Sequence, residues 1–282
     1  MADKPKRASE YRSEQFELVR ATCLYLATKL GDMTDDLVIV GGLVPSLIVD
    51  QTALPEDVAA HVGTMDLDVG LQLALLDEGR YRKLTERLRD AGFTMDKNED
   101  GNPTRQRWAI TSSGRVTVDF LIPPSREGDR GGKLRNIEPD FAAIIAPGLR
   151  CAFRDRQRVT LEGRTLFGEK AKREVWVCGA GSYVVLKALA FDSRGENKDA
   201  YDLYYIVRNF GSGVDDVFNK LEPLLDDPEA LKAIEILERD FRDPESVGPR
   251  RVAEFIAGAP DENIQADVVG FVGRVLRRLA GG

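Results

Sequence analysis

The 282-residue sequence contains a single histidine, His61, and three widely separated cysteines, Cys23, Cys151 and Cys178. One histidine cannot supply a zinc site with several imidazole ligands or phosphodiester chemistry by a histidine pair. No G-x-S-x-G motif offers the serine of a hydrolase triad. The cysteines form neither a C-x-x-C zinc motif nor a secreted disulfide framework, so we expect buried or inert thiols. Chemistry at a site in this chain must therefore rest on carboxylates, lysine, arginine and a metal.

Long apolar runs are also missing. No run approaches the roughly 18–20 apolar residues that a membrane-spanning helix requires, and the polar residues 1–15 contain no signal-peptide core. We therefore expect a cytoplasmic protein without a membrane partner. The formal net charge of −7 excludes a uniformly basic surface that coats nucleic acid, although it leaves room for a local basic groove.

The hydrophobic pattern changes along the chain and predicts an α+β fold. Short apolar runs predict a mixed β-sheet with flanking helices in an α/β lobe over residues 1–175. From residue 176 to 282, a helical periodicity predicts a C-terminal helical lobe. We expect this lobe to complete the candidate nucleotide site described below. Before this change, we expect strands at residues 158–162, 165–167 and 175–178.

Asp66 and Asp68 lie one residue apart in a segment that reads as a strand. Alternation along a strand places Met65, Leu67 and Val69 on one face and both carboxylates on the other. Two neighbouring carboxylates repel each other unless a cation lies between them, and Mg²⁺ takes such oxygen ligands together with substrate phosphates. A half-buried strand with a solvated acidic face would show the same pattern.

Two further features accompany this acidic pair. Gly41 and Gly42 join a short apolar run to a predicted helix, and such a turn lets phosphate oxygens approach backbone N–H groups. A tight structural turn is the simpler explanation. Asp119 lies within an otherwise apolar strand, where an unpaired carboxylate is costly to bury. A metal held by the acidic pair would be a partner for Asp119; a nearby arginine or a solvated sheet edge would also satisfy it.

A second group of charged residues surrounds a predicted helix–turn–helix. Lys187, Arg194 and Lys198 bring three cations together, and Asp199 and Asp202 open the following helix. Cationic side chains could bind triphosphate oxygens and stabilise charge on a leaving pyrophosphate. The two acids also complement the helix dipole, and a solvated charged turn would give the same pattern.

Together these pieces resemble the nucleotidyltransferase superfamily, in which a glycine pair, an acidic pair and a third acid on a later strand form one pattern. Two motifs are similar to those of the AbiEii/MenT-type toxins of AbiE-like (type IV) toxin–antitoxin systems. The first is T-x-D-x-D, and the second is K-x-x-A…R-G-x-x-K-D-x-x-D-L. The resemblance spans about residues 37–207, although Val62 stands where the family often has an arginine. The matching positions of the two motifs are Thr64, Asp66, Asp68, Lys187, Ala190, Arg194, Gly195, Lys198, Asp199, Asp202 and Leu203.

The resemblance implies a nucleotidyltransferase-like sheet lobe followed by a helical lobe, and an enzyme that transfers NMP from an NTP and releases pyrophosphate. It implies that Asp66, Asp68 and Asp119 hold one or two Mg²⁺ ions, with proton acceptance as an alternative role of Asp119. Lys187 is implied to be catalytic together with the three acids. The implied nucleotide-binding residues are Gly41, Gly42, Thr64, Lys187, Arg194, Lys198, Asp199 and Asp202.

The acceptor and the partners also follow only from the resemblance. Related toxins add nucleotides to the 3′ end of tRNA, which implies tRNA as acceptor and a cognate antitoxin protein as partner. Arg274, Arg277 and Arg278 could contact RNA, but basic residues of this kind are also ordinary on surface helices. Transfer to a protein or small-molecule hydroxyl, a non-catalytic nucleotide-binding regulator, and a scaffold with plain surface acids stay open as alternatives.

Overall fold

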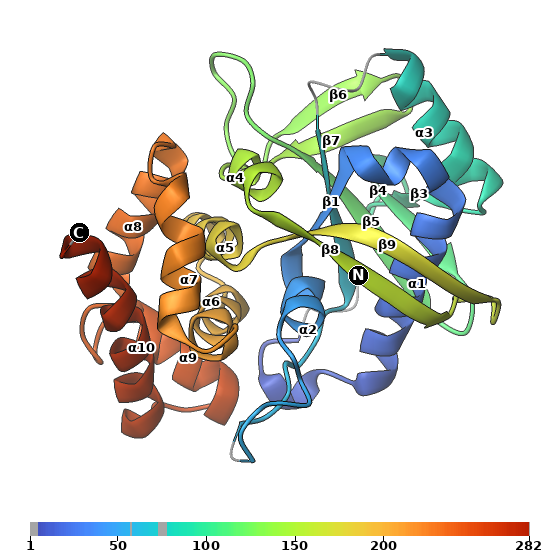
Figure 1. The fold of residues 1–282 in the computed structure, drawn as a ribbon. Helices are drawn as coiled ribbons and strands as arrows, with labels where there is room; N and C mark the ends of the chain where they lie inside the picture. The colour runs from blue at the N-terminus through green and yellow to red at the C-terminus, as the bar shows by residue number, and fades with distance from the viewer. Residues whose placement is uncertain (1–4, 57, 73–77, 282) are drawn as a thin grey trace.

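The computed structural model describes residues 5–56, 58–72 and 78–281. A mixed β-sheet with its own helices comes first, and the helices α5–α10 follow and pack together beside it (Figure 1). The predicted arrangement, a mixed sheet with flanking helices followed by helices, is confirmed. In Figure 1, α1 and α3 lie on the opposite side of the sheet from α5–α10.

The first helix shows how the sequence pattern becomes packing. Val19, Cys23, Leu26 and Leu30 recur at steps of three or four residues, and all four are buried in the core beneath the helix. The elements of this first part are α1 (Ser13–Leu30), β1 (Leu37–Val40), α2 (Val44–Ile48), β2 (Asp66–Leu71) and α3 (Glu78–Asp90).

The sheet has the strand order β3-β4-β5-β2-β1-β9-β8. The last residues of β5 also pair with β7, which in turn pairs with β6. Strands β4 and β5 form an antiparallel hairpin. The remaining elements of the sheet region are β3 (Thr94–Lys97), β4 (Pro103–Thr111), β5 (Arg115–Ile122), β6 (Leu134–Glu138), β7 (Phe141–Ile145), α4 (Leu149–Arg154), β8 (Arg156–Arg164) and β9 (Lys170–Cys178).

One predicted strand is wrong. Residues 165–167 form the turn between β8 and β9. The turn closes because the Gly168 N–H donates to the Thr165 carbonyl at 2.9 Å, and Gly168 takes a φ of +83° that favours glycine. The short apolar run that suggested a strand therefore lies where the chain reverses direction. The strands expected at 158–162 and 175–178 are present and extend further than predicted, as β8 and β9.

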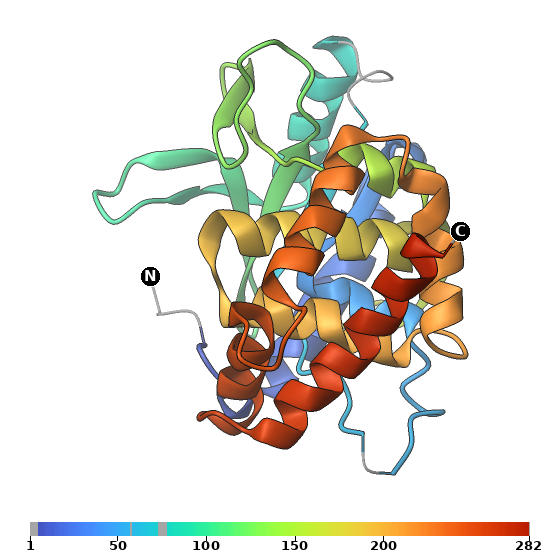
Figure 2. The same ribbon diagram turned by 90° about the vertical axis from the view of Figure 1, so that its left-hand side faces the viewer.

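After β9 ends at Cys178, the described elements up to residue 280 are helical, as predicted. Figure 2 shows these helices gathered in front of the sheet. Whether residues 1–175 and 176–282 act as two domains stays a prediction. None of the described helices combines the length and the apolar character needed to cross a bilayer. The helices are α5 (Ala180–Arg194), α6 (Asn197–Asn209), α7 (Val214–Leu221), α8 (Pro228–Asp240), α9 (Val247–Ala257) and α10 (Glu262–Ala280).

Strand β2 confirms the predicted alternation. Leu67 and Val69 are completely buried on one face, whereas Asp66 and Asp68 lie on the other face and are partly accessible. Gly70 shares the face of the acids, and a Cβ added to it would lie 2.9 Å from the Leu149 side chain of α4. The acidic face of β2 is therefore the face that α4 covers further along the strand.

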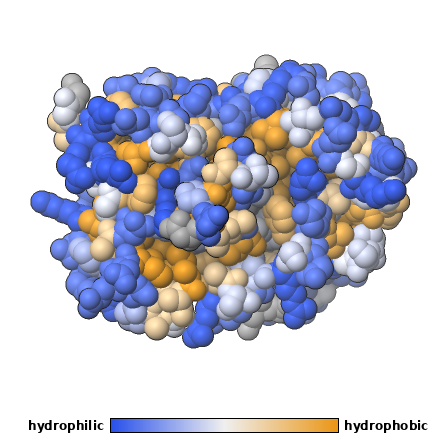
Figure 3. Space-filling view, turned by 60° about the horizontal axis from the view of Figure 1, so that its bottom comes forward, coloured by the Kyte–Doolittle hydropathy of each residue, from blue (hydrophilic) through white to orange (hydrophobic). Residues whose placement is uncertain are grey.

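The molecular surface is mixed in character. Figure 3 shows the face that lies at the bottom of Figure 1, where hydrophobic areas lie among hydrophilic side chains. Apolar atoms contribute roughly 55–60% of the accessible surface of ordinary folded proteins, so this distribution identifies no docking site by itself.

Candidate active site

The sheet register brings the three predicted acids to one place. Strand β2 runs antiparallel to β1 and parallel to β5, so Asp68 lies opposite Val40 on one side and opposite Asp119 on the other. Gly41 follows Val40 directly. The end of β1, the start of β2 and the middle of β5 therefore meet at one edge of the site.

The glycine pair is needed because motif side chains pack against its backbone. Gly41 has a φ of +73°, and a Cβ at this position would lie 1.9 Å from Oδ2 of Asp68. A Cβ on Gly42 would lie 2.8 Å from the Thr64 side chain. The Thr64 hydroxyl donates to Oδ1 of Asp66 at 3.1 Å. The two glycines thus make room for the acidic strand, which is a structural reason for them beside phosphate binding.

Asp119 is almost fully buried and has an arginine partner. The guanidinium of Arg107 donates from Nε to Oδ1 at 2.7 Å and from Nη2 to Oδ2 at 2.5 Å. Such a two-point hydrogen-bonded ion pair is a strong one, and Asp119 in turn raises the pKa of Arg107. The partner that the buried carboxylate requires is therefore an arginine in this structure, one of the alternatives that the sequence left open.

Helices α5 and α6 hold the predicted cations in a buried ionic network. Nζ of Lys187 lies 2.9 Å from Oδ1 of Asp199 and 2.7 Å from Oδ2 of Asp202. Arg194 donates to both oxygens of Asp199 at 2.5 and 2.7 Å, and Lys198 contacts Asp202 at 2.7 Å. The two aspartates therefore fix the positions of all three cations.

The pKa values of this network follow from burial and pairing. Burial opposes the charge on Asp202, but Lys187 and Lys198 outweigh it and hold the pKa of Asp202 well below its ordinary value. Burial likewise opposes the charge on Lys187, and Asp202 and Asp199 overcome it and raise the pKa of Lys187. Burial dominates at Lys198, whose pKa is lowered. Lys187, Asp199 and Asp202 consequently form a tightly coupled set of charges with little access to water, whereas Arg194 at its edge is exposed.

His61 is the remaining partner of Asp202. Its Nε2 lies 2.8 Å from Oδ1 of Asp202, and its Nδ1 accepts a hydrogen bond from the Gly63 N–H at 3.1 Å. Because Nδ1 accepts a hydrogen bond, the neutral ring carries its proton on Nε2, and this N–H donates a hydrogen bond to Asp202. Burial lowers the pKa of His61 to about 4. The ring is held between Tyr201 and Tyr205, at centroid distances of 5.3 and 4.9 Å.

One cleft of about 390 Å³ joins these pieces. The predicted site residues line it except Gly41, which packs against Asp68 instead. Six carboxylates and four cationic side chains line the cleft among the described residues, which leaves two net negative charges. We name this hollow the charged cleft; its ionisable lining residues are Asp66, Asp68, Arg107, Asp119, Lys187, Arg194, Glu196, Lys198, Asp199 and Asp202.

The fit of a metal to this cleft depends on two carboxylates. Within residues 5–56, 58–72 and 78–281, no group of three histidine, cysteine, aspartate or glutamate side chains is arranged to hold a metal ion. Asp119, the predicted third ligand, has both oxygens bound to Arg107. Mg²⁺ is commonly held by one or two carboxylates, with phosphates and waters completing its shell. Asp66 and Asp68 fit that smaller donor set.

Three residues of the site were not predicted. Arg107 could have been found, because the turn at residues 112–114 sets a hairpin register that places Arg107 opposite Asp119. Tyr11 lines the charged cleft, where burial and then Asp202 and Asp66 raise its pKa. No sequence signal connects Tyr11 or His61 to residues on α6, because those contacts depend on the tertiary fold.

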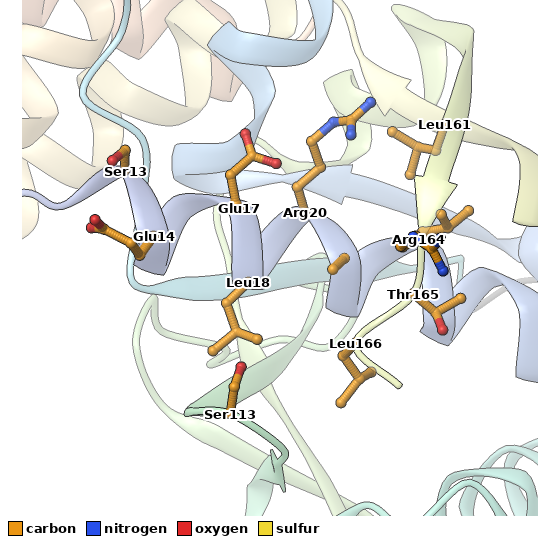
Figure 4. A pocket seen from close by; sticks show the side chains of 12 residues that line it. Ser13, Glu14, Glu17, Leu18, Arg20, Ser113, Leu161, Arg164, Thr165 and Leu166 are labelled. Atoms are coloured by element: carbon orange, nitrogen blue, oxygen red, sulfur yellow. The ribbon is translucent and has the colours of Figure 1, made fainter. Parts of the chain in front are cut away.

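Another hollow lies away from these residues. It has a volume of about 560 Å³ and lies between α1, β8 and the turn after β4 (Figure 4). Its charged lining residues are Glu14, Glu17, Arg20 and Arg164, and no predicted site residue lines it. Volume alone therefore does not identify the candidate site. The smaller charged cleft is identified by its concentration of paired charges.

Comparisons with known proteins leave the family open. No protein-family model matches the sequence, and no curated protein is similar to it. Among solved structures, the chain is similar to an antigenic nucleotidyltransferase-like protein from Paracoccidioides brasiliensis. The identity is 15% and the TM-score 0.40, over 77% of this chain and 93% of that chain. A likeness of this size does not assign the chain to a family.

Proposed function

We propose that this protein is a Mg²⁺-dependent nucleotidyltransferase that moves NMP from an NTP to a hydroxyl acceptor and releases pyrophosphate. The observation that carries the proposal is that two carboxylates and two lysines line one cleft. Asp66 and Asp68 come from β2, and Lys187 and Lys198 come from α5 and α6. Carboxylates that hold a metal and lysines that bind phosphate oxygens are the groups that phosphoryl chemistry requires.

The charge of the cleft explains why a divalent cation would be required. Its described lining carries two net negative charges, so a triphosphate alone would be repelled. A Mg²⁺ ion bound by Asp66 and Asp68 would cancel that excess and supply Lewis-acid polarisation of the phosphate. Lys187 and Lys198 are already fixed by Asp199 and Asp202, so they would meet the phosphates with little rearrangement.

Asp119 and Arg194 complete the proposed assignment. Asp119 would act as a further metal ligand or as the proton acceptor, either through the lone pairs that Arg107 does not use or after Arg107 releases one of the carboxylate oxygens. Arg194 is half exposed at the edge of the network, where it would contact the nucleotide. Thr64 positions Asp66 through its hydroxyl, and Gly41 and Gly42 leave the space that the acidic strand needs.

The acceptor and the biological role rest on the motif resemblance. We propose the 3′ end of tRNA as the acceptor and a toxin role that a cognate antitoxin opposes. The expected phenotype is arrested growth on expression of the wild-type chain and normal growth with Asp66→Ala/Asp68→Ala. Equal toxicity of both chains would contradict a toxin role that depends on this site.

The test of the activity uses purified protein, Mg²⁺, each α-labelled NTP in turn and total tRNA, beside the Asp66→Ala/Asp68→Ala variant. Label in tRNA with the wild type only would establish RNA as acceptor and identify the base. Label on protein would identify a protein hydroxyl as the acceptor in place of tRNA, and label on a small molecule would identify that molecule as the acceptor. Absence of both NTP binding and label would refute the assignment.

The Arg107–Asp119 pair favours one alternative, a nucleotide-binding regulator without catalysis. In that case the chain would bind Mg-NTP and transfer no label, because the third carboxylate never becomes available. An Arg107→Met variant separates the two functions. Gain of transfer in this variant would show that the arginine blocks an otherwise complete site.

A further inference from the structure

An apolar pocket adjoins the charged cleft. Its volume is about 240 Å³. The pocket and the cleft have five lining residues in common, so the two hollows lie next to each other. The shared residues are Asp68, Leu121, Ile144, Lys187 and Arg194.

The walls of the pocket come from both halves of the chain. Helix α5 contributes Leu186, Leu189 and Ala190 from one side. Strand β7 and the turn that follows contribute Ile145 and Pro147 from the other. The lining side chains away from the border with the cleft are almost all apolar. Such a pocket binds a flat, weakly polar group better than a phosphate.

We propose that this pocket is the nucleobase subsite of an NTP whose phosphates occupy the charged cleft, and that it selects the base by shape. The inference rests on the proposed function and deepens it. A pocket of 240 Å³ lies below the roughly 300–1,000 Å³ of sites for drug-sized ligands, so it takes one ring system rather than a whole nucleotide. The position of the pocket beside the cleft supports this occupant, because the base is the apolar end of the molecule whose other end needs cations.

Hydrogen bonds available for reading the base are few. The backbone N–H groups of Gly132, Ile145 and Ala146 already donate to carbonyl oxygens within the fold, at 2.9, 2.8 and 2.8 Å. The side chains that could contact the base are the buried Tyr183 hydroxyl, the Ser193 hydroxyl at the exposed end of the pocket and the Arg194 guanidinium at the border. A largely apolar pocket discriminates between similar ligands by roughly 10–200-fold, far less than a site built on hydrogen bonds. We therefore expect affinities for the four NTPs within that range of one another.

Ala190 is a lining residue of the pocket with a short side chain. It lies three residues after Lys187 on α5, so both side chains project from the same face of the helix. Lys187 reaches the charged cleft, and Ala190 lines the apolar pocket beside it. A large side chain at position 190 would fill the space of the base without removing any charged group of the cleft.

The test compares two kinds of ligand on three proteins. Binding of each Mg-NTP and of Mg-tripolyphosphate is measured by titration calorimetry for the wild type, Ala190→Phe and Ala190→Ser. Tripolyphosphate has the phosphates without the base. We expect the wild type to bind at least one NTP about 10-fold or more tighter than tripolyphosphate. Ala190→Phe should lose that difference and keep its tripolyphosphate affinity, and Ala190→Ser, which keeps the pocket open, should behave as the wild type.

The outcomes separate this inference from the proposed function. Equal wild-type affinity for NTPs and tripolyphosphate, or unchanged NTP binding in folded Ala190→Phe, would overturn the base subsite while leaving the phosphate site intact. Binding of neither ligand to the wild type would overturn the proposed function as well. A preference of more than about 10⁴-fold for one base would overturn selection by shape. Ser193→Trp, at an exposed position on the same rim, replaces Ala190→Phe if that variant does not fold.

Discussion

His61 makes stability depend on pH in a way that can be calculated from the structure. Burial holds the pKa of His61 at about 4 in the folded protein, against 6.5 for an ordinary histidine. Protonation would place a hydrogen on Nδ1, which accepts from the Gly63 N–H, so the hydrogen bond at 3.1 Å would be lost. The folded state therefore excludes a proton that the unfolded chain binds.

The sign and size of the effect follow by linkage. Above pH 6.5 neither state binds the proton, and the full stability is present. Between pH 6.5 and 4 His61 is protonated in the unfolded chain and neutral in the folded protein. The free energy of unfolding therefore decreases as the pH is lowered through this range. One pKa unit corresponds to about 1.4 kcal/mol, so the loss across this window is about 3 kcal/mol.

The assay is urea denaturation of the wild type and of His61→Gln at several pH values between 7 and 4. Glutamine can donate a hydrogen bond to Asp202 but does not titrate in this range. The difference in unfolding free energy between the two proteins at each pH therefore gives the contribution of histidine protonation. The chain has one histidine, and its imidazole signals in NMR therefore report the folded pKa directly. A wild-type pKa near 6.5, or a difference in unfolding free energy that does not change with pH, would refute this reasoning.

Three further predictions concern the site and the thiols. Gly41→Ala should abolish transfer, because its Cβ would displace the Asp68 carboxylate. Gly92 has a similar positive φ of +84° with nothing within 4 Å, so Gly92→Ala should keep transfer and lose about 1–2 kcal/mol in a thermal melt. Gly41→Ala should lose more than that, because the clash with Asp68 adds to the backbone strain. Lys187→Met should lower the free energy of unfolding by roughly 3–5 kcal/mol, because two buried aspartates lose a cation, and it should also weaken Mg-tripolyphosphate binding. A denaturation curve that matches the wild type would contradict the ionic network. All three cysteines are buried, and burial raises the pKa of Cys23 and Cys151 to about 12. A thiol reagent at pH 8 should therefore label no cysteine in the native protein and three cysteines per chain after unfolding. Fast labelling of the native protein would contradict the packing.

Local patterns predicted much of the sheet and of the site. Alternation alone placed Leu67 and Asp68 on opposite faces of β2, and a helical period of three to four residues identified the buried side of α1. The motif spacing also grouped Lys187 with Asp199, which the structure joins at 2.9 Å. These features are set by residues close together in the sequence, so their geometry follows from the period of one element.

Features that depend on distant parts of the chain could not be predicted. The contact between His61 and Asp202 joins residues 141 positions apart, and nothing near either residue indicates it. The turn at residues 165–167 has the composition of a strand, and only the pairing of β8 with β9 shows where the chain reverses. The apolar pocket is likewise lined by residues of both α5 and β7, so no single segment carries its pattern.

The central claim is that the bond broken in the NTP lies between the α- and β-phosphates. The most direct measurement gives the wild-type protein Mg²⁺, acceptor and the same NTP labelled either at the α- or at the γ-phosphate. We predict α-label on the acceptor and γ-label in released pyrophosphate, with neither product from Asp66→Ala/Asp68→Ala. Transfer of the γ-label to the acceptor, or equal activity of the double variant, would contradict it.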